Sequence, residues 1–381
     1  MDTEAAAPAT AGHGTMRAAK VRRFGLPDVI VLEETPLPVP GEGEVLVRVK
    51  AAGVGPWDAW IRAGRSVFPQ PLPLTLGADL SGVVAAVGKG VTAFAVGDAV
   101  FGATNPRFTG AYAEYAVASG GMIARKPASL TDADAASVPV IAVTAWQALF
   151  EQARLSRGDA VLIHGAAGNV GSFAVQLARA AGLRIAATAR PCDLAHVGRL
   201  GAGQVIDARA ERFEEKVGDV DAVVDLVGGD VQERSYSVLK PGGILVSAVS
   251  APDQDAPKRH GVTARFLLME VTTKRLEAIA AMLENRRPAH QCRGGAAAGS
   301  GARCALDARP HKPAAAREDR APRRVMKLRA LTNRIRFLSA HNQISNLFHL
   351  HRDHLAAGDY RAARACALTA WAEISGVAAA A

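Results

Sequence analysis

The chain has 381 residues, more than one ordinary hydrophobic core organises, so we expect two domains. Its formal net charge is +9, but residues 285–381 hold 17 Lys and Arg against 6 Asp and Glu, which leaves the first 284 residues close to neutral. A basic surface for nucleic acid is therefore excluded from the main body, and nucleic-acid binding by the tail is the weakest function considered.

The composition also argues against a membrane protein and a zinc cluster. No run of 18 apolar residues occurs, and residues 1–15 lack the charged start and apolar centre of a signal peptide. The four cysteines show neither paired spacing nor a C-x-x-C motif. We therefore expect a disordered leader over residues 1–15, no membrane partner and a cytoplasmic location.

Two patterns follow one another along the chain. Short strands separated by Gly and Pro predict a β-rich unit over residues 16–139, in which VLVRVK places Val45, Val47 and Val49 on one face. Apolar strands then alternate with helices, as in DAVLIHGA followed by NVGSFAVQLARAAG. This rhythm predicts a doubly wound parallel sheet with helices on both faces, over residues 140–265, and hence an α/β fold class.

A glycine-rich turn lies between the predicted strand 160–163 and the helix that follows it. The spacing is G-x-x-G-x-x-G. Glycines here let a pyrophosphate approach the backbone, and a helix N-terminus offers free amides and partial positive charge. An ordinary glycine-rich turn is the alternative for the motif alone, but the strand and helix rhythm favours a dinucleotide. The expected phosphate-binding residues are Gly165, Ala166, Ala167, Gly168, Asn169, Val170 and Gly171.

The end of the next predicted strand indicates which dinucleotide is bound. An NAD-preferring site usually has Asp or Glu there for the ribose 2′-hydroxyl, whereas RIAATARPCDL offers Thr188 and Arg190. We therefore expect NADPH, with Arg190 at the 2′-phosphate. An ordinary surface charge is the alternative for Arg190, and His196 and Arg199 are weaker candidates for the same phosphate.

These features together resemble the medium-chain dehydrogenase/reductase superfamily, and within it the zinc-independent quinone oxidoreductases related to zeta-crystallin. The likeness covers about residues 16–284 and rests on the glycine turn and on TAWQAL, GAYAEYAV, LGADLSGVVAAVG and DLVGG. The resemblance implies a GroES-like catalytic domain over residues 16–139, a Rossmann domain for NADPH over 140–265, and a return segment to the catalytic domain over 266–284. Relatives commonly pair, so a homodimer is also an expectation.

The resemblance further implies the residues of the site. Thr144 is expected near the nicotinamide, and two segments line the cofactor's ribose and ring; their members are Val227, Gly228, Ser247, Ala248 and Val249. The candidates for facing the substrate are Trp57, Asp58, Tyr112 and Tyr115. Ordinary core or strand packing is the alternative for Trp57 and for both tyrosines.

Zinc is not expected at this site. In the zinc alcohol dehydrogenases a Cys ligand stands where this chain has Gly55, and a His-Glu pair stands where it has Ala78 and Asp79. Catalytic zinc needs three protein ligands, and the first 284 residues hold one cysteine, Cys192. Many relatives have Asn where Gly55 stands, so a side-chain contact near the nicotinamide is lost. Without a Lewis acid, the reaction that fits is hydride transfer from NADPH to a quinone or an α,β-unsaturated carbonyl.

Residues 285–381 depart from the family. Relatives continue with segments like VGAVLPLADARAAHEMLAG and GKIVL, whereas this chain continues with a basic stretch rich in Arg, Ala and Gly that is predicted to be disordered. A one-base shift of the reading frame near codon 285 accounts for the change, because codons for residues 317–322 exist whose shifted frame reads GKIVL. The degeneracy of Ala, Gly, Arg and Pro codons is the alternative explanation. Loss of the closing strands leads to the alternative function, an NADPH-binding protein with little or no turnover.

Overall fold

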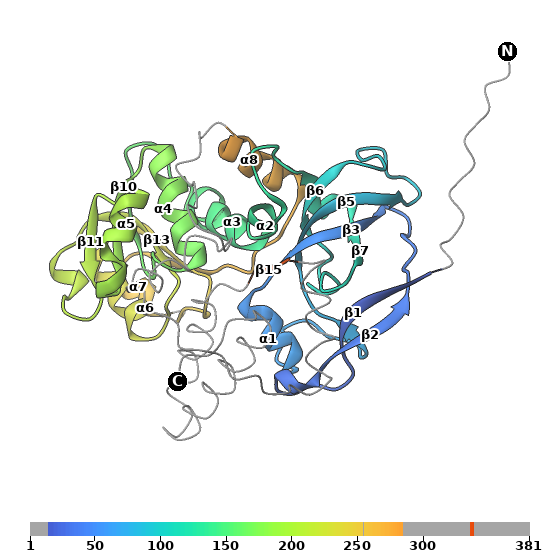
Figure 1. Ribbon diagram of the computed structural model, residues 1–381. Helices are drawn as coiled ribbons and strands as arrows, with labels where there is room; N and C mark the ends of the chain where they lie inside the picture. Colours follow the sequence, from blue (N-terminus) through green and yellow to red (C-terminus); the bar gives the residue numbers. More distant parts are fainter. Residues whose placement is uncertain (1–13, 254, 285–335, 339–381) are drawn as a thin grey trace, which may run out of the picture.

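The computed structural model describes residues 14–253, 255–284 and 336–338 of the chain. The expected leader, up to residue 13, and all of the tail except residues 336–338 lie outside the described residues. Two lobes lie side by side, an antiparallel one that begins with β1 and a parallel one that contains β10 and β11 (Figure 1). Among the described helices, none combines the length and the hydropathy that a membrane span requires.

Antiparallel strands form the first lobe. One sheet has the order β2-β1-β4, and a second has the order β15-β3-β5-β6-β8, with β7 also paired to β3. These strands are β1 (Thr15–Val21), β2 (Ile30–Pro36), β3 (Glu44–Gly53), β4 (Leu74–Thr75), β5 (Asp79–Val87), β6 (Ala99–Ala103), β7 (Tyr115–Ser119) and β8 (Ile123–Arg125). The short helices of the lobe are η1 (Pro27–Val29), α1 (Pro56–Arg62), η2 (Gly120–Met122) and α2 (Asp132–Ala136).

In strand β3, the alternating valines of the sequence face the core of the lobe. Val45, Val47 and Val49 are at most 3% exposed and belong to the core of this lobe, so the predicted buried face is confirmed. The last residues of β3 also pair in parallel with β15 (Arg336–Leu338), the one part of the tail that the structure describes. These three residues form a strand in the part of the tail, from about residue 326 onward, where the sequence shows helix-like patterning.

Parallel strands form the second lobe, in the order β11-β10-β9-β12-β13-β14. The strands are β9 (Ala160–Ile163), β10 (Arg184–Ala189), β11 (Gln204–Asp207), β12 (Val220–Asp225), β13 (Leu239–Ser247) and β14 (Thr263–Phe266). Between them run α4 (Asn169–Ala181), η4 (Pro191–Asp193), α5 (Leu194–Leu200), η5 (Phe213–Glu215), α6 (Asp230–Arg234), η6 (Ser235–Val238) and α7 (Ala256–Arg259). The order is that of a Rossmann fold, with the first strand, β9, next to the fourth, β12. The predicted fold class is confirmed.

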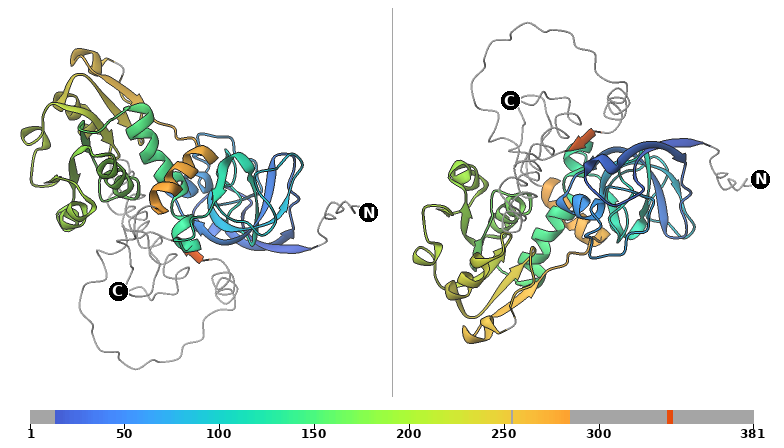
Figure 2. Two further views of the ribbon diagram at one scale, coloured as in Figure 1. Left: turned by 90° about the horizontal axis from the view of Figure 1, so that it is seen from above. Right: turned by 90° about the horizontal axis from the view of Figure 1, so that it is seen from below.

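Three helices join the lobes: α3 (Pro139–Trp146), the π-helix η3 (Gln147–Gln152) and α8 (Thr273–Glu284). Figure 2 shows α8, in orange, at the junction of the two lobes from above and from below. The guanidinium of Arg275 on α8 donates to both carboxylate oxygens of Glu151 on η3, each at 2.8 Å. Thr273 Oγ1 donates to the carbonyl oxygen of Ile123 in the first lobe at 2.6 Å. Helix α8 therefore ties the chain that leaves the parallel sheet back to the antiparallel lobe.

Candidate active site and cofactor site

The glycine turn connects β9 to α4 and leaves the start of that helix open. Gly165 has a φ of 68°, and the amide of Gly168 donates to its carbonyl oxygen at 2.9 Å. Helix α4 begins at Asn169 with Gly168 as its N-cap, so no side chain caps it, and its first turn holds no acidic residue. The first amides of a helix have no acceptor within the helix and attract negative charge. An uncapped 13-residue helix of this kind fits a diphosphate.

Gly171 lets α4 pack directly on the turn. A Cβ at this position would lie 2.4 Å from the carbonyl oxygen of Gly165 and 2.7 Å from the Cα of Ala166. Both contacts are with backbone, which cannot rotate away as a side chain can. Any larger residue would therefore push the helix N-terminus away from the turn, so the predicted role of glycine in close helix packing has a steric basis here.

A second loop lies beside this turn at the end of β12. Asp225, which is completely buried, accepts hydrogen bonds from the amides of Val227 at 3.0 Å and Gly228 at 2.8 Å through Oδ1. Its Oδ2 accepts from Nε2 of Gln232 at 3.0 Å. A Cβ on Gly165 would lie 3.2 Å from Cγ2 of Val227, so the two loops are in contact. Asp225 thus fixes the loop that carries two of the predicted cofactor residues.

The loop after β13 completes this edge of the sheet. The hydroxyl of buried Ser247 accepts from the amide of Val249 at 3.4 Å, and the amide of Ala248 donates to the carbonyl oxygen of Asp225 at 3.1 Å. A Cβ on Gly228 would lie 3.3 Å from Cγ2 of Val249. The structure therefore brings the three predicted segments together at the carboxyl ends of β9, β12 and β13, where Rossmann folds bind their ligands.

His164 lies directly before the turn and was missed by the sequence reasoning. Its Nε2 is 3.0 Å from Oγ of Ser235, and its Nδ1 is 3.0 Å from Oγ1 of Thr188. Ser235 donates its own proton to the carbonyl oxygen of Val231 at 2.6 Å, so we assign the imidazole proton to Nε2 and a hydrogen bond from Thr188 to Nδ1. Burial lowers the pKa of His164 to about 4, so the ring is neutral. A histidine that ends an apolar strand is the signal that could have revealed it.

Arg190 stands after β10, as predicted, but it has a partner that the sequence did not reveal. Its Nε and Nη2 both lie 2.9 Å from Oδ2 of Asp193. The side chain of Arg190 is 39% exposed and that of Asp193 is 5% exposed. One edge of the guanidinium is thus held by a buried carboxylate, and this fixes where the exposed part of the group lies.

Asp58 and Tyr112 meet in the antiparallel lobe. Asp58, on the first turn of α1, is buried, and its Oδ2 accepts from the amide of Gly55 at 2.7 Å and from the hydroxyl of Tyr112 at 2.9 Å. Its Oδ1 is also buried and has no well-aligned hydrogen-bond partner among the described residues. Two of the four candidates for facing the substrate are therefore in direct contact.

Burial is the main influence on the protonation of Asp58. It raises the pKa of Asp58 to about 7, against the opposing effects of the amides of Gly55 and Gly77, the hydroxyl of Tyr112 and the charge of Arg62. The pKa of Tyr112 lies well above its usual range. Burial is the main cause, and the negative charge of ionised Asp58 is the second. The carboxyl of Asp58 and the phenol of Tyr112 are therefore both protonated below about pH 7.

A second buried carboxyl, that of Asp79, connects this cluster to helix α3. Burial, and then the charge of Asp58, raise the pKa of Asp79 well above its ordinary value. Oδ1 of Asp79 accepts from the amide of Val140 on α3 at 3.3 Å. One turn later on α3, buried Thr144 donates its hydroxyl proton to the carbonyl oxygen of Val140 at 2.7 Å. The predicted neighbour of the nicotinamide therefore lies one helical turn from a residue that Asp79 binds.

The indole of Trp57 covers Gly55. A Cβ on Gly55 would lie 2.1 Å from Cε2 and Cζ2 of Trp57, so the indole fills the space that any side chain at position 55 would need. The indole Nε1 is buried and has no hydrogen-bond partner among the described residues. An aromatic ring therefore occupies the space of a side chain at position 55, and its N–H has no partner among the described residues.

Tyr115 lies apart from this cluster. It is on β7, where Ala116 and Ala118 face the main core, and it packs instead against the small cluster of Met16, Ala18 and Ala113. The structure therefore does not bring Tyr115 to Asp58.

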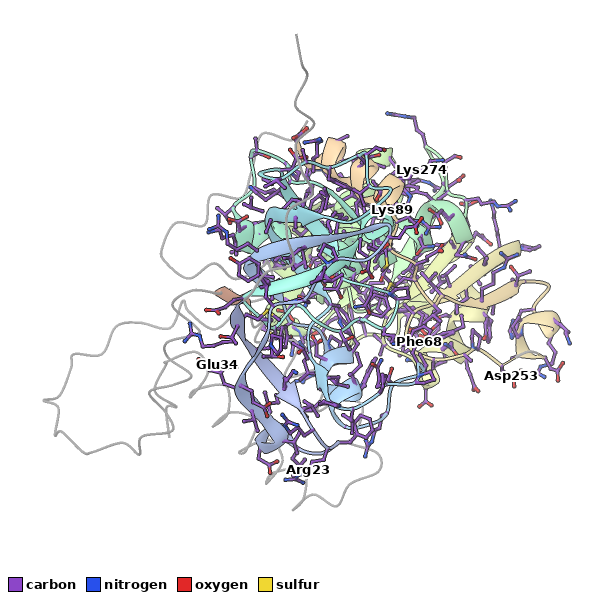
Figure 3. The ribbon with its side chains drawn as sticks, turned by 90° about the vertical axis from the view of Figure 1, so that its right-hand side faces the viewer. Arg23, Glu34, Phe68, Lys89, Asp253 and Lys274 are labelled. Carbon is purple, nitrogen blue, oxygen red and sulfur yellow. The ribbon has the colours of Figure 1, made fainter. Side chains whose placement is uncertain are left out.

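Figure 3 labels Phe68, on the loop after α1, whose ring centroid lies 6.4 Å from that of Phe108. Phe68 adds an aromatic side chain that the sequence reasoning did not single out.

Two of the positions that hold zinc ligands in the alcohol dehydrogenases are occupied here by Gly55 and Ala78. Gly55 offers a backbone amide that is bound to Asp58, and Ala78 has no donor atom in its side chain. Across the described part of the chain, His, Cys, Asp and Glu do not gather in a group of three or more that could hold a metal ion.

Comparison with known proteins decides the family. Residues 41–128 match the alcohol dehydrogenase GroES-like domain, and residues 169–287 match the domain described as zinc-binding dehydrogenase. A quinone oxidoreductase of Lama guanicoe is 33% identical over 269 residues, which cover 68% of this chain and 81% of that protein. The chain belongs to the quinone oxidoreductase family of the medium-chain dehydrogenase/reductase superfamily.

Further relatives agree with this assignment. The quinone oxidoreductase of Homo sapiens is 35% identical over 243 residues, which cover 62% of this chain and 73% of the human protein. The structure of the quinone oxidoreductase from Coxiella burnetii matches with a TM-score of 0.67 and 35% identity, over 71% of this chain and 88% of that one. The predicted resemblance is confirmed: the chain is an oxidoreductase of small molecules whose family implies a nicotinamide cofactor.

Proposed function

We propose that the chain transfers hydride from NADPH to a quinone or an α,β-unsaturated carbonyl without a metal ion. The observation that carries the proposal is the uncapped start of α4 on a glycine turn, with the guanidinium of Arg190 at the end of the neighbouring strand. The first-turn amides would hold the pyrophosphate, and Arg190 would meet the 2′-phosphate. When bound, the reduced nicotinamide supplies a hydride.

The pairing of Arg190 with Asp193 favours NADPH over NADH. Asp193 is the nearest carboxylate in sequence that could accept from a ribose 2′-hydroxyl, but its Oδ2 is already bound by Arg190 and its side chain is 5% exposed. The accessible group at this edge is the cation. A guanidinium recognises phosphate strongly because it offers several donors in one plane.

The substrate side favours an uncharged acceptor. The groups that meet there are the indole of Trp57, the hydroxyl of Tyr112 and the buried carboxyl of Asp58. A carbonyl oxygen accepts hydrogen bonds from such donors, and reduction by hydride requires a proton in addition. Replacement of the zinc-ligand positions by Gly55 and Ala78 is consistent with reduction that depends on hydrogen bonding instead of a Lewis acid.

Binding and turnover test the proposal separately. We expect the full chain to bind NADPH, measured by quenching of protein fluorescence, and to oxidise it with benzoquinone or cyclohexenone. Arg190→Ala should weaken NADPH binding about tenfold or more, because hydrogen bonds to charged groups contribute about 1.5–3 kcal/mol, and leave NADH binding unchanged. The matched control is Arg199→Ala, which removes a cation from α5.

Each outcome has a distinct meaning. Equal loss of NADPH and NADH binding in Arg190→Ala would contradict the assignment of the 2′-phosphate to this residue. A selective loss in Arg199→Ala instead would move the phosphate to α5. Tight NADPH binding by the wild-type chain with no oxidation by either acceptor would support the cofactor-binding alternative and exclude the proposed reaction.

A further inference from the structure

The proton that reduction consumes needs a source, and the geometry of Asp58 supplies one. Two of the donors that reach this carboxyl, the amide of Gly55 and the hydroxyl of Tyr112, point to Oδ2, and the amide of Gly77 acts on the carboxyl as well. When the group is protonated, its proton therefore belongs on Oδ1. That oxygen is shielded from bulk solvent and has no well-aligned partner among the described residues. An O–H on Oδ1 would therefore have no well-aligned acceptor among the described residues.

The surroundings of Asp58 keep the acid ready at neutral pH. Tyr112 faces it with a hydroxyl, the guanidinium of Arg62 acts on it from the end of α1, and Asp79 lies close enough for the two carboxyls to repel each other when charged. The pKa of Asp79 stays well above its ordinary value because of burial and this repulsion. Asp58 therefore ionises first, while Asp79 is still neutral.

The position of the acid also fits a reaction beside the cofactor. Asp79 binds the amide of Val140, and Thr144 on the next turn of the same helix is the residue expected near the nicotinamide. On the other side, the indole of Trp57 covers Gly55, whose amide holds Asp58. The N–H of that indole has no partner among the described residues, and an O–H on Oδ1 of Asp58 would also lack one. A buried donor is costly to leave unpaired.

We propose that Asp58 is the proton donor of the reduction and passes the proton on Oδ1 to the carbonyl oxygen of the quinone or enone. The inference rests on the proposed function. The hydride brings two electrons and forms a C–H bond, and the electron pair displaced from the acceptor's π bond moves onto the carbonyl oxygen. Asp58 supplies the one proton that this oxygen needs and becomes a carboxylate, which water protonates again before the next turnover.

Tyr112 acts through Asp58 as a positioning residue. Its hydroxyl donates to Oδ2, so it stabilises the carboxylate that remains after proton transfer. Removing this donor makes ionisation of Asp58 harder. The carboxyl should then stay protonated to a higher pH, which gives a readout that loss of packing alone would not produce.

The principal variant is Asp58→Asn, which keeps the size of the side chain and an oxygen for both donors. We expect the turnover number for quinone reduction at about pH 6 to fall about 100-fold or more, the range of general acid catalysis, with NADPH affinity unchanged. In the wild-type chain the rate should be constant below the pKa of about 7 and fall tenfold per pH unit above it. This alkaline limb should be missing in Asp58→Asn.

Two further variants separate proton donation from a structural effect. Tyr112→Phe should move the alkaline limb to higher pH, because the phenol lowers the pKa of Asp58. Asp79→Asn should leave the limb in place, because Asp79 carries no charge when Asp58 ionises. A limb that moves equally in both variants, or in neither, would show that the pH dependence belongs to another group and would overturn the inference.

Infrared difference spectroscopy of the cofactor-free chain tests the acid without turnover. A carboxyl C=O band should disappear near neutral pH in the wild-type protein and be missing from the corresponding spectrum of Asp58→Asn. Absence of this band, or turnover within threefold of wild type in Asp58→Asn, would overturn the role of Asp58 while leaving the proposed function intact. A wild-type chain that reduces neither a quinone nor an enone would overturn the proposed function, and the role of Asp58 with it.

Discussion

Gly171→Ala tests how closely α4 must approach the glycine turn. The added Cβ would lie 2.4 Å from the carbonyl oxygen of Gly165, and 2.7 Å and 2.9 Å from the Cα and carbonyl carbon of Ala166. All three neighbours are backbone atoms, so the helix start and the turn must separate to admit the methyl group. Gly171 does not have a positive φ, so the cost of alanine here is steric and not conformational.

The magnitude follows from two opposing contributions. Overpacking of a close-packed site costs about 1–3 kcal/mol, and the upper part of that range applies because none of the contacted atoms can rotate away. Alanine in place of glycine within a helix returns about 1 kcal/mol. We therefore expect the free energy of unfolding to fall by about 1–2 kcal/mol. Displaced first-turn amides should also weaken NADPH binding about tenfold.

Gly198→Ala is the matched control, because Gly198 also lies in a helix of the parallel lobe. A Cβ there would have no atom within 4 Å. The same helix propensity then acts without a clash, and we expect a gain of about 0.5–1 kcal/mol. Urea unfolding followed by tryptophan fluorescence gives both free energies, and fluorescence titration gives the NADPH affinities. If the two variants changed stability in the same direction, the steric explanation of Gly171 would be refuted.

Two other substitutions test buried carboxyls. Asp225→Asn should weaken NADPH binding about threefold to tenfold and cost about 1 kcal/mol of stability, because the new amide meets the amide of Gln232 and leaves a buried donor unpaired; thermal unfolding and titration measure both. Because burial raises the folded-state pKa of Asp58 to about 7 from 3.8, its contribution to stability is present below about pH 3.8 and is lost as the pH rises through 7. The stability of Asp58→Asn relative to wild type should therefore increase by up to about 4 kcal/mol between about pH 4 and 8, and a difference that stayed constant in urea unfolding would contradict the raised pKa.

The parts of the fold that the sequence predicted are those with a local physical signal. Alternation in β3 places its valines in the core, and the 3.6-residue period of α4 places Ala174, Leu177 and Ala178 there. The glycine turn was predictable because its spacing and its place between strand and helix are both local. The segments around Val227 and Val249 were expected only because of the family resemblance.

The contacts that define the candidate active site carry no such signal. Tyr112 is 54 residues away from the aspartate that its hydroxyl binds, and His164 is 71 residues away from Ser235. Neither distance corresponds to a period of helix or strand, so the pairing depends on how separate elements pack. Tyr115 also shows that a shared motif does not predict a shared location. It lies in the same motif as Tyr112, but its side chain packs against another cluster.

One position connects the absence of a metal ligand to the acid that we infer. By resemblance, Gly55 stands where the zinc enzymes have a cysteine ligand. Because Gly55 has no side chain, the indole of Trp57 can lie over it, and the backbone amide of Gly55 donates to Oδ2 of Asp58. The carboxyl of Asp58 is buried, and the loss of solvation is the main cause of its raised pKa. We therefore propose that hydrogen-bond donation and proton transfer from Asp58 take the role of metal chemistry at this place in the fold.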